Sequence, residues 1–243
     1  MGAAAPVETL AYGYGLIEGP RVDDRGNLFF SDVTNGGVFR LAPDGTISTV
    51  IPKRRGVGGI ALHADGGLVV SGRDVCHVKD GVTRVLFERP EGVLGFNDLF
   101  TDAAGRVYVG SLRSDPFREG PRTPGECYRI EAEGRATELY GGVGLSNGIG
   151  FGPEGHVLYH ADTAAREVIV HNLDDDGRAV HRRSFTTLGD PDGLAVDERG
   201  FVWVALYGGG RVVCHSPFGL FDDAIEVPAR AVTSVCFGRD REL

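Results

Sequence analysis

Glycines that precede short, apolar, strand-like runs recur along the chain at intervals of about forty residues. The turn glycines are Gly26, Gly66, Gly105, Gly155 and Gly200, so successive spacings are 40, 39, 50 and 45 residues. Repeats of this period are typical of β-propellers, in which each copy supplies one antiparallel blade. No helical period of 3.6 residues competes with the repeat over any length. The repeat therefore favours an all-β fold.

The first copy of the unit indicates four strands separated by tight turns. These strands are predicted at residues 20–23, 27–32, 37–41 and 46–51. Glycine contributes 38 of the 243 residues, more than twice its usual share of about 7%, and it is spread over turn positions. We expect a single domain over residues 1–243, folded as a six-bladed β-propeller.

The sixth copy of the unit is short. It begins at Ala231–Gly238 and continues only to Leu243, so we expect the sixth blade to be incomplete. Because a closed propeller leaves no long strand edge unpaired, three interpretations stay open. The chain is abbreviated, or residues such as Val7 to Tyr14 close the ring, or an edge is shared with a second chain.

The third copy is the longest, and its extra residues fall in Arg113 to Glu126. This segment is rich in proline, glycine and charged residues. Polar insertions of this kind form surface loops or lids over a pocket. Both interpretations remain open.

Four polar side chains share one position in the repeat, eight residues before a turn glycine. They are Glu18, Asn97, Asn147 and Asp192, and the same position in the other two copies holds Gly58 and Thr233. The first strand of each propeller blade faces the central channel, so we expect these side chains to converge there. Two carboxylates and two amides supply oxygen ligands for one hard divalent cation, with Ca²⁺ favoured, Mg²⁺ or Mn²⁺ suitable, and Zn²⁺ an alternative.

The residues that follow this shared position support the same interpretation. Gly19, Gly148 and Gly193 come directly after Glu18, Asn147 and Asp192, and glycine permits a close approach of backbones. Asn97 differs, because Asp98 follows it. The alternative is that each polar residue caps a turn.

Composition argues against several functional classes. A net charge of −9 does not suit a nucleic-acid partner, which requires a basic face. No apolar stretch approaches the ~18 residues of a membrane span, and no targeting segment is recognisable. The four cysteines, widely spaced and without a CxxC pair, indicate reduced core residues. We expect a cytoplasmic protein without nucleic-acid or membrane partners; its oligomeric state is left open.

Five short motifs carry a resemblance to a known family over nearly the whole chain. They are Glu18-Gly19-Pro20, Phe96-Asn97-Asp98, Leu145-Ser146-Asn147-Gly148, Pro191-Asp192-Gly193-Leu194 and Val232-Thr233-Ser234-Val235. With them the chain resembles the senescence marker protein-30, gluconolactonase and luciferin-regenerating enzyme family. The resemblance implies a six-bladed propeller with one divalent metal held by Glu18, Asn147 and Asp192. It also implies that Asp192 is the acid/base carboxylate, that Asn97 contacts the substrate or completes the metal shell, and that the substrate is a sugar lactone.

The sequence departs from the family pattern in two places. Many sugar lactonases carry an arginine two residues before the Asn-Asp pair, where this chain has Gly95. A cationic contact to substrate hydroxyls is therefore expected to be missing. The family chain also continues further past the Phe237-Gly238 pair.

We therefore expect a metal-dependent hydrolase that opens a lactone with an activated water molecule. In this scheme Asp192 takes the proton from water and Asn97 orients the substrate. No serine lies in a Gly-x-Ser-x-Gly elbow. The alternatives are an organophosphate hydrolase that uses the same residues and a metal-binding propeller without catalysis.

Overall fold

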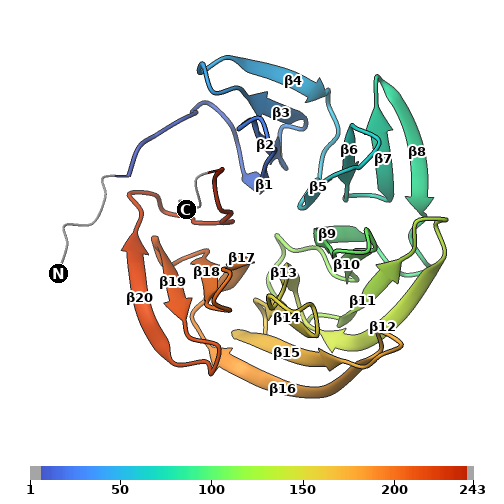
Figure 1. The fold of residues 1–243 in the computed structure, drawn as a ribbon, viewed down its shortest axis with the longest axis vertical. Coiled ribbons are helices and arrows are strands. Elements are labelled where there is room, and N and C mark those ends of the chain that lie inside the picture. Colours follow the sequence, from blue (N-terminus) through green and yellow to red (C-terminus); the bar gives the residue numbers. More distant parts are fainter. Residues whose placement is uncertain (1–6, 240–243) are drawn as a thin grey trace.

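A computed structural model, which describes residues 7–239, shows an all-β propeller (Figure 1). Within these residues, twenty strands form five four-stranded antiparallel sheets arranged around a common axis. Blade 1 contains β1 (Ile17–Val22), β2 (Leu28–Asp32), β3 (Val38–Leu41) and β4 (Ile47–Ile51). Blade 2 contains β5 (Ile60–Leu62), β6 (Leu68–Val70), β7 (Val75–Lys79) and β8 (Val82–Phe87).

Blade 3 contains β9 (Gly95–Thr101), β10 (Val107–Leu112), β11 (Gly125–Ile130) and β12 (Ala136–Val143). Blade 4 contains β13 (Ser146–Phe151), β14 (Val157–Asp162), β15 (Glu167–Leu173) and β16 (Ala179–Thr187). Blade 5 contains β17 (Pro191–Val196), β18 (Val202–Leu206), β19 (Arg211–His215) and β20 (Phe221–Glu226). In every blade the chain runs from the strand nearest the axis outward, and consecutive strands are hydrogen-bonded neighbours.

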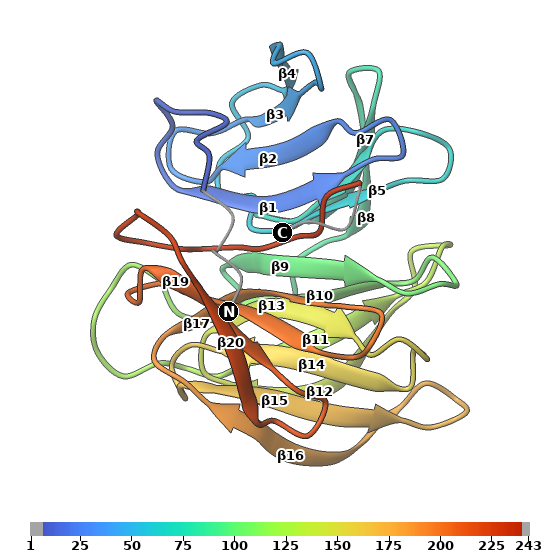
Figure 2. The ribbon, with the colours of Figure 1, turned by 60° about the vertical axis from the view of Figure 1, so that its left-hand side comes forward.

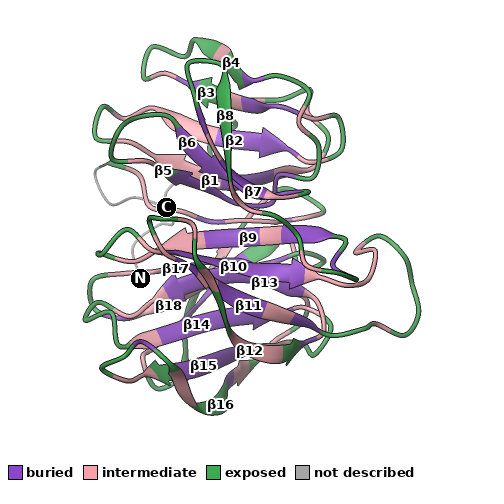
Figure 3. Cartoon of the chain, turned by 90° about the vertical axis from the view of Figure 1, so that its right-hand side faces the viewer, coloured by how far each residue is buried: buried purple, intermediate pink, exposed green. Residues whose placement is uncertain are grey.

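Burial decreases from the axis to the outer edge of each blade (Figure 3). Five of the six residues of β17 are buried, whereas the first four residues of β8 are exposed. Inner strands are surrounded by neighbouring blades and consist mainly of apolar or small residues, together with the polar residues of the shared position. Outer strands have one face toward solvent, so polar residues are interspersed with apolar ones along them.

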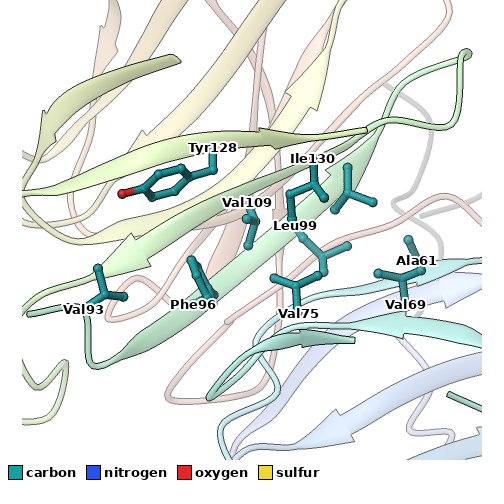
Figure 4. Packing of buried hydrophobic residues seen from close by; sticks show 10 residues of the cluster. Ala61, Val69, Val75, Val93, Phe96, Leu99, Val109, Tyr128 and Ile130 are labelled. Atoms are coloured by element: carbon teal, nitrogen blue, oxygen red, sulfur yellow. The ribbon is translucent and has the colours of Figure 1, made fainter. Parts of the chain in front are cut away.

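The hydrophobic core lies between blades. In one cluster, Ala61, Val69 and Val75 of blade 2 pack against Phe96 and Leu99 of blade 3 (Figure 4). Similar clusters join blade 1 to blade 2, blade 3 to blade 4, and blade 4 to blade 5. Each blade is therefore stabilised by its neighbours, as expected for a repeat that cannot bury its own faces.

Close contacts between inner strands depend on glycine. A Cβ atom at Gly148 of β13 would lie 2.4 Å from the backbone nitrogen of Leu194 in β17. A Cβ atom at Gly59 would lie 2.3 Å from the backbone nitrogen of Leu99 in β9. These distances are shorter than any real Cβ contact, so only glycine permits this spacing of the strands.

The blade number differs from the six predicted, because the described residues form five blades. Residues 231–239 contain no strand, and they lie between β17 and β1 (Figure 2). The backbone N–H of Gly193 donates to Thr233 O at 2.7 Å, and Thr233 Oγ1 donates to Ile17 O at 2.6 Å. Val232 and Val235 pack on blade 5. This segment has no partner strands with which to form a four-stranded sheet. It packs against the neighbouring blades instead.

The N-terminal residues do not supply a closing strand. Residues 7–14 contain no strand. The ring of Tyr14 packs against Phe30 and Phe39, with centroid distances of 5.0 and 4.9 Å. This segment therefore covers blade 1, and the proposed closure by Val7 to Tyr14 is wrong.

All four cysteines are free, and Cys76, Cys127 and Cys214 are buried, in agreement with the predicted core role. Burial raises the pKa of the Cys127 thiol to about 12, so this side chain stays protonated and inert. Between residues 7 and 239 there is no helix long and apolar enough to cross a membrane.

Replacing Gly148 with alanine tests the spacing of the inner strands. Because the added Cβ would collide with backbone atoms of β17, we expect a loss of stability of about 1–3 kcal/mol. In a chain of this size each kcal/mol lowers Tm by about 2–4 °C. Thermal unfolding of Gly148→Ala beside Gly189→Ala measures the effect, since a Cβ at Gly189 meets nothing within 4 Å. Equal melting temperatures for the two variants would contradict the close approach.

Candidate functional site

The four polar residues predicted to converge do line one cavity, whose volume is about 820 Å³. Glu18 lies on β1, Asn97 on β9, Asn147 on β13 and Asp192 on β17. The two remaining members of the shared position behave differently. A Cβ at Gly58 would lie 2.1 Å from Asn97 Oδ1, so this glycine provides room for Asn97. Thr233 uses its hydroxyl group to bond the backbone of β1.

A β-bulge lies at the shared position in three inner strands, and directly after it in the fourth. In each of three strands, two consecutive residues oppose a single small residue of the next strand: Asn97 and Asp98 oppose Gly110, Asn147 and Gly148 oppose Ala161, and Asp192 and Gly193 oppose Ala205. In β1 the register shifts directly after Glu18. A bulge bends the strand and re-aims its side chains. The repeated bulge explains why one sequence offset places four side chains in the same cavity.

Glu18 and Asp192 form a buried acidic pair. Their side chains belong to residues that are 8% and 4% exposed. Burial, with the charges of Asp192 and Asp98 adding to it, raises the pKa of Glu18 well above its usual range. Burial and the charge of Asp98 do the same to the pKa of Asp192. Among the described residues the Asp192 carboxylate has no hydrogen-bond donor or ion-pair partner, so the pair lacks a compensating positive charge.

Asp98 is a third buried carboxylate that the sequence analysis did not assign to the site. It occupies the place of the glycine that follows the shared position in β1, β13 and β17. Burial raises its pKa to about 6, and Arg21, 3.9 Å away, opposes that shift. Arg21 is itself fixed by donation from Nη2 to Leu99 O at 3.0 Å. In the sequence, the one indication of its role is that aspartate stands here where the other three copies have glycine.

Hydrogen bonds fix the orientation of Asn147. Its Nδ2 donates to Thr163 Oγ1 at 2.6 Å, and that hydroxyl donates to Pro191 O at 2.6 Å. Its Oδ1 accepts from Asn97 Nδ2, which also donates to Ser146 O at 2.8 Å. The Asn147 amide oxygen is therefore directed to the side of Asn97, and Thr163 links it to the strand that carries Asp192. No motif marks Thr163 in the sequence.

The donor chemistry of these residues fits a divalent cation. Within residues 7–239, no three His, Cys, Asp or Glu side chains are grouped as a metal site, so the set depends on the amide of Asn147 for its third oxygen. Carboxylate and amide oxygens are the ligands that Ca²⁺, Mg²⁺ and Mn²⁺ prefer. The unpaired acidic pair is the feature that favours a cation here, because two buried like charges are costly without one.

The segment Arg113 to Glu126 forms one wall of the cavity mouth. Asp115, Pro116, Phe117 and Arg122 of this segment line the cavity. Its ends are fixed, because Arg113 Nε donates to Glu126 Oε1 at 2.6 Å. The segment therefore borders the cavity, and both interpretations of it, a surface loop and a lid, stay open.

The position of the expected but missing arginine is closed to side chains. A Cβ at Gly95 would lie 2.9 Å from Gly72 O and 4.0 Å from the Cα atom of Arg73. The backbone N–H of Phe96 donates to Gly72 O at 2.7 Å and holds the two blades together there. Arg73, on the turn between β6 and β7, lines the same cavity.

Comparison with known proteins gives lactonases among the relatives. The chain is 35% identical over 223 residues to 6-deoxy-6-sulfogluconolactonase of Pseudomonas putida, a match that covers 87% of this chain and 75% of that protein. It is 32% identical over 223 residues to pentonolactonase XacC of Haloferax volcanii, covering 88% of this chain and 74% of that protein.

The fold is shared with a solved structure described as the calcium-binding protein regucalcin of Agrobacterium tumefaciens. That structure matches with a TM-score of 0.81 and 22% identity, over 93% of this chain and 79% of the other. The model of the SMP-30/gluconolactonase/LRE-like region matches residues 16–243. The chain therefore belongs to the SMP-30/gluconolactonase/LRE-like family.

Proposed function

We propose that the protein is a divalent-metal-dependent lactonase that hydrolyses a sugar lactone or a related lactone. The observation that carries the proposal is the convergence of Glu18, Asn147 and Asp192 with Asn97 in one cavity, where the acidic pair lacks a compensating charge. The lactonase names of two relatives support the reaction type. The partner is a small-molecule lactone, and a cytoplasmic location stays a prediction.

Three residues are suited to hold the cation. Glu18 and Asp192 supply carboxylate oxygens, and Asn147 supplies an amide oxygen whose direction is set by Thr163. When bound, a divalent cation supplies Lewis-acid polarisation of the lactone carbonyl. The calcium-binding description of the similar regucalcin structure supports Ca²⁺ as the first ion to test.

The remaining chemistry belongs to the chain. Hydrolysis adds water to the carbonyl carbon and breaks the acyl C–O bond, which leaves a hydroxy acid and releases a proton. Asp192 is placed to accept the proton of the attacking water, and its burial raises the pKa of its carboxyl toward the range of a general base. The Nδ2 group of Asn97 already donates to Ser146 O and Asn147 Oδ1, so its Oδ1 atom is the group that can accept a hydrogen bond from a substrate hydroxyl. The apolar side chains of Leu94 and Phe117 border the mouth.

A lactone panel tests the proposed function. Proton release is followed with aldonolactones, an aliphatic lactone and an aryl phosphotriester, with Ca²⁺ or with a chelator. We expect lactone turnover that the chelator abolishes and that Ca²⁺ restores. Turnover of the phosphotriester alone would assign the site to organophosphate hydrolysis. Metal-dependent stabilisation without any turnover would assign the chain to non-catalytic metal binding.

Replacing Asp192 with asparagine should change stability and function in opposite directions. A carboxyl whose folded pKa is raised contributes stability at pH values below its unfolded pKa of about 4, and this contribution is lost as pH rises through the folded pKa. Metal-free Asp192→Asn at neutral pH should therefore melt about 2–4 °C above the metal-free wild type. It should also lose the rise in Tm caused by Ca²⁺ and lose turnover.

The control is Asp175→Asn, an exposed carboxylate of the β15–β16 turn. This variant should keep the melting temperature and the Ca²⁺ response of the wild type. A full Ca²⁺ response in Asp192→Asn would contradict the assignment of Asp192 as a ligand.

Replacing Thr163 tests the positioning of Asn147. In Thr163→Val the Asn147 Nδ2 loses its acceptor, so only the bond from Asn97 Nδ2 still orients the amide. Loss of a group that orients a ligand weakens metal affinity by about 10–100-fold, and calorimetric titration with Ca²⁺ measures it. Turnover at saturating Ca²⁺ should be largely recovered. Thr163→Ser keeps the hydroxyl group and should bind Ca²⁺ as the wild type does; equal affinities for the Val and Ser variants would count against this role.

A further inference from the structure

Three arginines surround the cavity mouth without a carboxylate partner among the described residues. These rim arginines are Arg73, Arg89 and Arg122. Arg89 Nη1 donates to Leu94 O at 2.9 Å, and Arg122 donates to Asp115 O and Pro116 O, both at 3.2 Å. Arg73 is exposed and has no hydrogen bond or ion pair with any residue in the described part of the chain.

The carboxylates of the mouth are oriented toward other arginines. Asp115 Oδ2 lies 3.4 Å from Arg118 Nε, and Asp190 Oδ1 lies 3.7 Å from Arg166 Nε. Neither of these two arginines lines the cavity. In a chain with a net charge of −9, three guanidinium groups without carboxylate partners on one side of the cavity favour an anionic group of the ligand on that side.

The rim arginines and the acidic pair lie on different blades. Arg73 is on the β6–β7 turn, Arg89 precedes β9, and Arg122 precedes β11, so all three come from blades 2 and 3 or their junction. Glu18, Asn147 and Asp192 come from blades 1, 4 and 5 (Figure 1). A substrate that spans the cavity therefore meets carboxylates and amides at one end and guanidinium groups at the other.

We propose that the substrate is a lactone that carries an anionic group remote from its carbonyl, and that Arg73 binds this group with help from Arg89 and Arg122. This inference rests on the proposed lactonase function. A guanidinium group offers paired N–H donors that match two oxygens of a carboxylate, sulfonate or phosphate. Arg73 has all its donors free for such an anion, whereas the other two arginines already use part of theirs.

The backbone beside Arg73 explains why this cation comes from blade 2. Gly95 of β9 cannot carry a side chain against Gly72 O, so the neighbouring strand contributes none at this point. Arg73 lies beside this position, because its Cα atom is 4.0 Å from where a Cβ atom of residue 95 would be. The cavity therefore has a cation near this point that comes from the adjacent blade.

Matched substrates test the proposal. Initial rates are measured with Ca²⁺ for glucono-1,5-lactone and for the same ring bearing a carboxylate, sulfonate or phosphate at carbon 6. We expect kcat/KM to be at least tenfold higher for one or more of the anionic lactones. Arg73→Gln should lower kcat/KM for that anionic lactone at least tenfold, mainly through KM, and change the neutral lactone less than twofold. The control is Arg84→Gln, an exposed arginine of β8 that does not line the cavity.

Binding of the open-chain products distinguishes a failure of the anion site from a failure of the lactonase function. Calorimetry compares gluconate with its 6-phosphate and 6-sulfonate analogues on the wild type and on Arg73→Gln. Turnover without a preference for anionic lactones, or equal losses for neutral and anionic lactones in Arg73→Gln, overturns the anion site and leaves the lactonase function. Arg73-dependent binding of the anionic products without any turnover overturns the lactonase function and leaves the anion site. The preferred anion among the three identifies the substituent.

Discussion

The close approach of the inner strands determines both the fold and the site. Backbones pass so near one another that Gly59, Gly148 and Gly193 have no room for a Cβ atom. The bulges at the same level direct Asn97, Asn147 and Asp192 into the cavity. These close contacts between strands thus place polar groups from separate blades within reach of one ligand, whereas the apolar clusters lie between the blades.

This arrangement places like charges close together in the cavity. The protein offsets their repulsion by apolar packing outside the cavity. Glu18, Asp98 and Asp192 are all buried, yet only Asp98 has an arginine close by. The apolar clusters between blades hold the ring together around a centre that is electrostatically unfavourable when metal-free. Binding a cation and maintaining the fold are therefore opposing demands on the same carboxylates, a common relation between activity and stability.

Much of the fold and part of the site could be predicted from the sequence. Turn glycines located the strands because their left-handed backbone is a local requirement, as at Gly26 and Gly200. The shared offset located four cavity residues because a bulge lies at that position in three inner strands and directly after it in β1. The blade number was wrong, since residues 231–239 have the pattern of an inner strand but no partner strands. The surroundings of Asp98, Thr163 and Arg73 depend on contacts with other blades, which no local pattern records.

The segment that carries Thr233 makes the ring asymmetric. Among the described residues, this segment forms one backbone hydrogen bond with Gly193 of β17 and one hydroxyl bond to Ile17 of β1, and its valines pack on the β17 side alone. Glu18 is the next residue after Ile17, and Asp192 is the residue before Gly193. A ligand bound by both carboxylates would therefore connect blade 1 to blade 5 directly, at the junction where no four-stranded sheet of the described chain lies between them.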